Sequence, residues 1–251
     1  MNGEMVWWSE LVVMTLWLLA LGVPRLARCC AWAGFFVGLV LLTALWVHLE
    51  RPPLRTLGET RLWYALLLAL IGLALEWRLR TTVVRTPTLA LGALFIGLNL
   101  VFPETLDRTL MPALRSPWFV PHVVAYLSAY AVLSLSAGIA AWRWWRRDSD
   151  IALPLILVHA GLALLTIGLC LGAIWAKSAW GHYWAWDPKE TWALLTWIAY
   201  VGVLHGERSL RDQPRVLLAL IAGCFLVVLS CWFLVNYLPA TAVSVHTYSR
   251  Q

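Results

Sequence analysis

The chain has 251 residues, of which 61% are hydrophobic and 13% are charged, and its mean hydropathy is +0.75. An ordinary soluble domain is about half apolar and about a quarter charged, and a chain of this length has too little interior to bury the excess. Composition therefore excludes a soluble enzyme, a disulfide-rich secreted domain and a disordered chain. It leaves an integral membrane protein, and we read the net charge of +6 as a sign of membrane orientation rather than of nucleic-acid binding.

Apolar runs of roughly 20 residues, the length that spans a bilayer, follow one another along the whole chain. They cover residues 6–23, 31–48, 62–77, 86–102, 118–142, 151–175, 190–206 and 216–237. The sequence thus predicts an all-α polytopic bundle of about eight spans, forming a single integral membrane domain over residues 1–251. The cysteines inside these runs are expected to be small core residues: Cys170, Cys224 and Cys231.

The loops between the runs alternate in their content of cations. One set of short loops holds eleven arginines: Arg25, Arg28, Arg78, Arg80, Arg85, Arg143, Arg146, Arg147, Arg208, Arg211 and Arg215. The opposite set holds the other eight cations over longer loops. Because the denser set is expected to face the cytoplasm, both termini and the loops 49–61, 103–117 and 176–189 are predicted to lie outside.

The loop between the sixth and seventh runs is unusually rich in tryptophan. Six of the 23 residues from 175 to 197 are tryptophan: Trp175, Trp180, Trp184, Trp186, Trp192 and Trp197. An aromatic belt at the membrane surface accounts for those near the helix ends. It does not account for Trp180, Trp184 and Trp186, which we place inside the external loop, residues 176–190, with His182 and Tyr183. Aromatic faces in a hydrophilic loop suit a large, flat, apolar ligand such as a porphyrin.

The end of this loop carries the signals of a helix start. Asp187 is a typical N-cap, Pro188 suits the first helical position, and Glu190 falls in the first turn. The two lysines of the chain, Lys177 and Lys189, flank the loop. Their charges can meet carboxylates such as haem propionates, or they can lie in water at the membrane interface.

The stretch WGHYWAWDPKETWALLTW, residues 180–197, closely resembles the WWD signature of haem-handling membrane proteins, and in detail that of the CcsA (ResC) family of cytochrome c biogenesis. RPPLRTLGETRLWY, residues 51–64, is similar to the first outer loop of that family. LMPALRSPWFVPHVVAYLSAYA, residues 110–131, resembles the segment that carries its first external haem-ligand histidine. The related CcmC haem-delivery proteins share the WxWD core but usually lack the PKETW continuation.

Histidines are the natural candidates for iron ligands, because neutral imidazole is a common axial ligand of haem. His122 opens the fifth run and His246 follows the eighth, so the predicted topology places both on the side of the tryptophan-rich loop. The resemblance implies that they are the two axial ligands of an external haem. His205 lies 15 residues beyond Glu190, about 22 Å deeper at 1.5 Å per residue. The resemblance implies that it binds an intramembrane haem together with a histidine of a CcsB (ResB)-type partner.

The remaining histidines are given supporting roles. His48 ends the second run as a support residue, His159 is expected in the core with a bond to a neighbouring helix, and His182 is expected to support the loop rather than to bind iron. The outer cations that could hold haem propionates, or simply be solvated, are Arg51, Arg55 and Arg115.

The resemblance implies a CcsA subunit of a CcsBA-type cytochrome c synthetase in the bacterial inner membrane. Such a subunit moves haem b across the bilayer and presents it to the CxxCH segment of an apocytochrome c, with CcsB as partner. We assign no catalytic acid or base, so the expected contribution is positioning. The predicted haem-binding residues are His122, His246 and His205 as iron ligands, with Trp180, Trp184, Trp186, Asp187, Tyr183, Trp192, Lys177 and Lys189.

Two alternatives stay open at the level of sequence. One is a CcmC-like protein that loads haem onto a chaperone. The other is a non-catalytic membrane interaction protein whose tryptophans are interface anchors.

Overall fold

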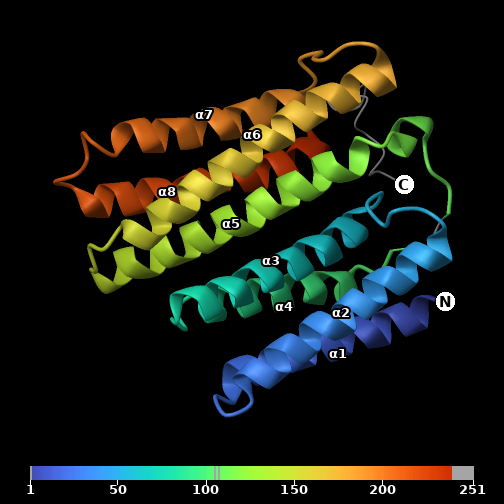
Figure 1. The fold of residues 1–251 in the computed structure, drawn as a ribbon, viewed down its shortest axis with the longest axis horizontal. Coiled ribbons are helices and arrows are strands. Elements are labelled where there is room, and N and C mark those ends of the chain that lie inside the picture. Colours follow the sequence, from blue (N-terminus) through green and yellow to red (C-terminus); the bar gives the residue numbers. More distant parts are fainter. Residues whose placement is uncertain (1, 105, 107, 239–251) are drawn as a thin grey trace. The chain divides into compact units, whose positions relative to one another are not determined.

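A computed structural model describes residues 2–104, 106 and 108–238, and this part of the chain is α-helical. In chain order its elements are α1 (Gly3–Gly22), α2 (Ala27–Leu49), α3 (Leu57–Leu79), α4 (Arg85–Val101), η1 (Pro112–Arg115), α5 (Phe119–Arg146), α6 (Ala152–Trp180), α7 (Pro188–Gly206), α8 (Pro214–Trp232) and η2 (Leu234–Tyr237). Figure 1 shows their course. Each predicted run is a helix, so the predicted all-α polytopic bundle is confirmed. The last run was predicted too long, because α8 ends at Trp232 and a separate 3-10 turn follows it.

Six of the helices in the described residues are long and apolar enough to cross a bilayer, and the chain is a multi-pass membrane protein. The exceptions are α4 and α7. Helix α4 is apolar but has only 17 residues. Helix α7 has Lys189 and Glu190 in its first turn and His205 in its last turn, and these polar residues lower its mean hydropathy. The side of the membrane that each loop faces stays a prediction.

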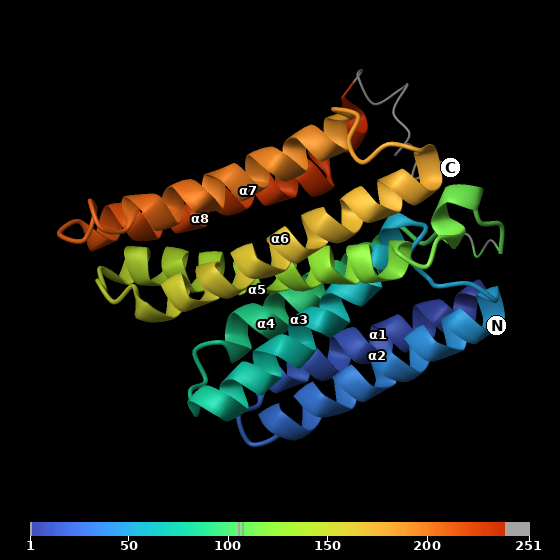
Figure 2. The same ribbon diagram turned by 45° about the horizontal axis from the view of Figure 1, so that its top comes forward.

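The chain divides into two compact units, residues 1–111 and residues 112–251. In the first unit α1 and α3 each pack against both α2 and α4, and in the second α5 and α7 each pack against both α6 and α8. Figures 1 and 2 show both as antiparallel groups of four helices. In each group the odd-numbered helices therefore begin at the end where the even-numbered helices finish. A single membrane domain comprising both units stays a prediction.

Within the second unit, α6 approaches α5 through the glycines at positions 161, 168 and 172. Spacings of seven and four residues place these glycines on one helix face. A methyl group on each would clash with an α5 side chain, at 2.4 Å from Leu133, 2.8 Å from Tyr126 and 2.7 Å from His122. Small residues let helices approach closely in a membrane, where packing rather than hydrophobicity drives association.

The cysteines are only partly where the apolar runs predicted them. Cys231 is buried and Cys224 is half-buried, but Cys170 is exposed, so the prediction of a core position for Cys170 is wrong. It lies about half a turn around α6 from the glycine face, because 100° per residue separates position 170 from position 168 by roughly 200°. An apolar run shows that a helix is in the membrane, but it does not show which face meets the other helices.

The glycine face gives a direct test of this packing. We expect Gly161→Ala to lower the free energy of unfolding by about 1–3 kcal/mol, because the added methyl overpacks against Leu133. That cost exceeds the gain of up to about 1 kcal/mol that alanine brings to a helix. Gly223→Ala on α8 is the matched control, because no atom of the described residues lies within 4 Å of its Cβ position. Thermal unfolding in detergent measures both variants. Equal stability of the two would contradict the close approach of α5 and α6.

Candidate functional site

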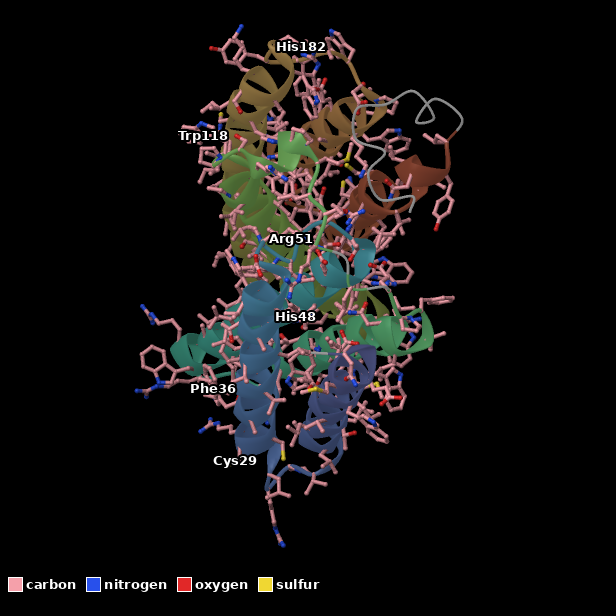
Figure 3. The ribbon with its side chains drawn as sticks, turned by 90° about the vertical axis from the view of Figure 1, so that its right-hand side faces the viewer. Cys29, Phe36, His48, Arg51, Trp118 and His182 are labelled. Atoms are coloured by element: carbon pink, nitrogen blue, oxygen red, sulfur yellow. The ribbon has the colours of Figure 1, made fainter. Side chains whose placement is uncertain are left out.

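The candidate site lies at the end of the second unit where α6 runs into α7 (Figure 1). The Trp loop, which we define as residues 181–187, makes this connection, and Figure 3 places His182 at its tip. The prediction that Trp180 lies in the loop is wrong, because α6 continues through Trp180. Gly181 caps the end of the helix: its φ of 86° lies in the left-handed region, and its N–H donates to the Lys177 carbonyl.

A reciprocal capping box joins the Trp loop to α7, which confirms the predicted helix start. The Asp187 carboxylate accepts a hydrogen bond from the Lys189 N–H at 2.9 Å. In return, Glu190 Oε2 accepts from the Asp187 N–H at 3.2 Å and from the Ala185 N–H at 2.7 Å. Trp186 lies between those two bonds with φ at 58°, a conformation that is uncommon for an aromatic residue. Glu190 thus holds the backbone on both sides of an exposed Trp186.

The role of Glu190 in the Trp loop was missed at the level of sequence. The D-x-x-E spacing of a capping box was present as a signal. We used Glu190 only as an acidic residue in the first turn of the helix. The spacing also predicts that its carboxylate turns back towards the loop that precedes the helix.

His122 lies in the first turn of α5 with its ring held on three sides. Its ring stacks on Trp175, with centroids 5.4 Å apart and planes at 24°, and it meets the Tyr126 ring edge to face at 5.1 Å. Nδ1 lies 3.0 Å from the Gly168 carbonyl oxygen. A carbonyl can only accept, so Nδ1 carries the proton and Nε2 carries the lone pair. This is the form in which an imidazole binds a metal through Nε2, with its other nitrogen held by an acceptor.

Trp175 connects His122 to the base of the Trp loop. It is buried, and its Nε1 donates to the Ala113 carbonyl in η1 at 2.8 Å. Its ring contacts Trp180 in a T-shaped arrangement at 4.7 Å and Phe119 at 5.4 Å. At the level of sequence Trp175 was one of six tryptophans with no separate role. Its importance comes from neighbours that are distant in the chain.

Two tryptophans of the Trp loop itself pack against each other. The rings of Trp184 and Trp186 are 5.9 Å apart and nearly perpendicular. Trp184 Nε1 is buried and has no hydrogen-bond partner within the part of the chain that the structure describes. An indole N–H can only donate, and leaving it unsatisfied is costly. The site therefore has a donor for an acceptor group such as a carboxylate, and this fits a haem propionate.

The lysines that flank the Trp loop differ in position. Lys177 is exposed, and its Nζ donates to the Gly181 carbonyl at 2.8 Å and lies 5.5 Å from the centre of the Tyr183 ring. It thus orders the junction of α6 and the loop. Lys189 is half-buried in the first turn of α7, and Trp192 is half-buried one turn further on. Their contact with a haem stays a prediction.

His205 and His159 lie in the half of the second unit that is remote from the Trp loop. Trp197 Nε1 donates to Thr166 Oγ1 at 2.9 Å and sets the register of α7 against α6. His205 is eight residues beyond Trp197, and His159 is seven residues before Thr166, so both lie about 11–12 Å from that bond at 1.5 Å per residue. The two histidines are therefore at about the same depth on neighbouring helices.

Both histidines are exposed, and each bonds to a carbonyl of its own helix. His205 Nδ1 is 2.9 Å from Val201 O, and His159 Nδ1 is 2.9 Å from Leu155 O. The prediction that His159 is a core residue bonded to a neighbouring helix is wrong, because the carbonyl one turn back satisfies its ring. In both residues the bond leaves the lone pair on Nε2.

The other predicted residues are spread along the chain. His246 lies outside the described residues, His182 is exposed, and His48 is half-buried in the last turn of α2. Arg51 is buried and bonds the Glu59 carboxylate through both terminal nitrogens, at 2.9 and 2.7 Å. This guanidinium is bound to a carboxylate of its own unit instead of being presented to a ligand.

Comparison with known proteins identifies the family that this sequence matches. Residues 54–242 match the family described as cytochrome C assembly protein. A cytochrome c biogenesis protein CcsA of Prochlorococcus marinus strain MIT 9312 is 35% identical over 187 residues, which are 59% of this chain and 60% of that relative. A protein of the same name from Prochlorococcus marinus strain CCMP1986 is 31% identical over 255 residues, with 86% of this chain and 80% of the relative covered. The chain thus spans three fifths of the first of these relatives and four fifths of the second.

The fold and the site define a polytopic helical membrane protein with a tryptophan-rich loop next to a histidine that stacks on Trp175 and bonds a backbone carbonyl. The chain belongs to the cytochrome c assembly protein family, within its CcsA group of cytochrome c biogenesis proteins.

The hydrogen bonds of Glu190 give a test of how the Trp loop is held. We expect Glu190→Ala to loosen residues 181–187, because the N–H groups of Ala185 and Asp187 lose their acceptor. The cost is about 1–2 kcal/mol, as for loss of a helix cap. Hydrogen–deuterium exchange should be faster in the loop and unchanged in α5. Glu207→Ala at the other end of α7 is the control. Unchanged exchange in the loop of Glu190→Ala would show that Glu190 does not hold it.

Proposed function

We propose that this chain carries haem to the Trp loop and presents it there to an apocytochrome c for covalent attachment, as the CcsA subunit of a CcsBA-type synthetase. The observation that supports this most directly is the state of His122. Its ring is stacked on Trp175, its Nδ1 proton is held by Gly168 O, and Nε2 carries the lone pair. A histidine in that state is prepared to bind iron at the base of an aromatic loop.

The substrate in this proposal is haem b, and the side chains around the Trp loop match its chemistry. Its large apolar face suits the indoles of Trp180, Trp184 and Trp186, which lose little conformational entropy on stacking. Its propionates need donors, and the buried Trp184 Nε1 is one. Lys189, half-buried beside the loop, is a candidate for the second propionate.

The second axial ligand in the proposal is His246. It follows α8, which finishes at the same end of the second unit as the Trp loop because the helices are antiparallel (Figure 2). Two imidazoles on one iron tune its reduction potential. The histidine of an incoming CxxCH segment would then replace one of them.

Attachment itself needs no redox partner on this chain. Each cysteine thiol of the apocytochrome adds its S–H across one haem vinyl group, so one C–S bond and one C–H bond form and no atom leaves. We assign no catalytic acid or base, and the contribution of this chain is to orient the vinyl groups. A partner of the CcsB (ResB) type would supply the surface that docks the apocytochrome in the bacterial inner membrane, with the Trp loop on its outer side.

His205 forms a second haem-binding site in the proposal, at the end of the second unit remote from the Trp loop. It is exposed on α7 in a stripe with Leu195 and Ile198. An exposed histidine in an apolar stripe suits a ligand shared with another subunit, because a polar group in lipid needs a partner. We propose that a histidine of the CcsB-type partner completes this site.

The ligand roles of His122 and His246 are tested on the purified protein. We expect it to be red, with the reduced spectrum of a bis-histidine haem. His122→Ala and His246→Ala should each lose haem or oxidise readily, because one axial ligand is missing. His182→Ala, an exposed histidine in the Trp loop, is the matched control and should keep the spectrum. Unchanged spectra in both ligand variants would refute the assignment.

The proposed haem-binding site at His205 is tested by comparing the single variants His205→Ala and His159→Ala, each in the complex with CcsB. His159 is the matched control, because it is exposed at the same depth and has the same pattern of hydrogen bonding. We expect His205→Ala to lower haem content and cytochrome c maturation several-fold, and His159→Ala to leave both unchanged. Equal losses in the two variants would contradict a ligand from the partner and would indicate a pair within this chain.

A further inference from the structure

The first unit contains a cavity to which nothing in the proposed function assigns a role. Its volume is about 350 Å³, and it lies at the end where α1 and α3 begin and α2 and α4 finish. Figure 3 labels His48 and Arg51 at this end of α2. Among the residues that line it are Trp7, Glu10, Gly58, Asn99, Phe102 and Glu104.

Asn99 presents an unsatisfied acceptor in this cavity. The side chain is only 6% exposed, and its Nδ2 donates to Glu10 Oε1 at 2.8 Å and to the Gly58 carbonyl at 3.0 Å. Because the Gly58 carbonyl can only accept, the amide cannot be turned around without losing that bond. Asn99 Oδ1 is then buried with no partner within the described ranges, 2–104, 106 and 108–238. It needs a hydrogen-bond donor from a molecule in the cavity.

The charges around the cavity are unbalanced. Of the four carboxylates among the described residues that line it, Glu59 is paired with Arg51 at 2.7 Å and Glu104 with Arg61 at 3.5 Å. For Glu4 and Glu10 the described residues supply no salt bridge within 4 Å, and Glu10 is only 5% exposed on a helix long and apolar enough to span a bilayer. The cation that acts on Glu10 from further away is Arg61, which is already paired with Glu104. A buried carboxylate is costly without a counter-charge. Among the same residues no cluster of His, Cys, Asp or Glu is suited to hold a metal ion.

The remaining walls of the cavity are apolar and aromatic. Trp7 and Trp8 meet in a T-shaped pair with centroids 4.9 Å apart, and Phe102 contributes a third ring. Trp7 Nε1 already donates to the Leu100 carbonyl at 3.2 Å, so the polar atom of that ring is satisfied. The faces of indole rings attract cations, and their area suits an apolar chain.

We propose that this cavity binds a primary ammonium group carried on an apolar chain. The ammonium forms the salt bridge that the described residues do not give Glu10, and it supplies the N–H donor that they do not give Asn99 Oδ1. The apolar chain lies against Trp7 and Phe102. A neutral alcohol brings a donor without charge, and a quaternary ammonium brings charge without a donor, so neither satisfies both groups. The inference stands apart from haem handling, which we place in the second unit.

Binding is tested with dodecylamine on the purified full-length protein, by native mass spectrometry and by the shift in melting temperature. We expect dodecylamine to bind at least tenfold more tightly than dodecanol or dodecyltrimethylammonium. Glu10→Gln should lower its affinity at least tenfold. Glutamine keeps the oxygen that accepts from Asn99 Nδ2, so this variant should remain folded. Glu50→Gln is the control, because Glu50 lies in the same unit and its exposed carboxylate pairs with Arg108 at 3.1 Å, outside the cavity.

Two results would overturn the proposal: equal affinity for the three amphiphiles, or equal affinity of Glu10→Gln and the native chain for dodecylamine. A competition experiment identifies the natural source of the ammonium. In nanodiscs that contain phosphatidylethanolamine, loss of dodecylamine binding relative to phosphatidylcholine nanodiscs assigns the site to an ethanolamine head group. Equal binding in both assigns it to a free long-chain amine. Haem spectra should be the same with and without dodecylamine, which separates this site from the proposed haem site.

Discussion

The close approach of α6 to α5 is the constraint on which the candidate site depends. Glycines at positions 161, 168 and 172 remove the side chains that would hold the helices apart. At the last two of them the space is filled by rings of α5, including that of His122. The same approach brings the Gly168 carbonyl to the His122 ring, where it fixes the proton on Nδ1. Helix packing and the chemistry of a possible iron ligand are thus set by one set of contacts.

The Trp loop is held by backbone hydrogen bonds and ring contacts rather than by burial. Glu190 bonds two N–H groups on either side of Trp186, and Lys177 bonds the carbonyl of Gly181. Trp180 then connects the loop through Trp175 to His122. A surface whose rings are already placed loses less entropy when it binds a flat ligand. This gives a physical reason for a tryptophan-rich loop to follow directly from one helix and lead directly into the next.

In the first unit, buried charged residues lie at the end where α1 and α3 begin. The Arg51–Glu59 pair is nearly fully buried and bidentate. Removing one partner of such a pair strongly destabilises the protein, because the other charge is then buried without compensation. Glu10 and Asn99 depart from this pattern, since they bond each other but leave, among the described residues, Asn99 Oδ1 without a donor and Glu10 without a salt bridge. A site of this kind costs stability in an isolated protein, and a bound molecule that supplies the donor and the charge offsets that cost.

The sequence by itself determined the helices, the N-cap of α7 at Asp187 and the membership of the family. These depend on local signals: the length of apolar runs, capping residues and a contiguous motif. Only the tertiary structure decided that Trp175 stacks on His122, that His159 lies level with His205, and that Asn99 Oδ1 has no donor among the described residues. It also moved Trp180 from the loop into α6. Such facts depend on which faces of separate helices meet. When a membrane helix is apolar on all sides, its hydropathy does not show which face packs against the other helices.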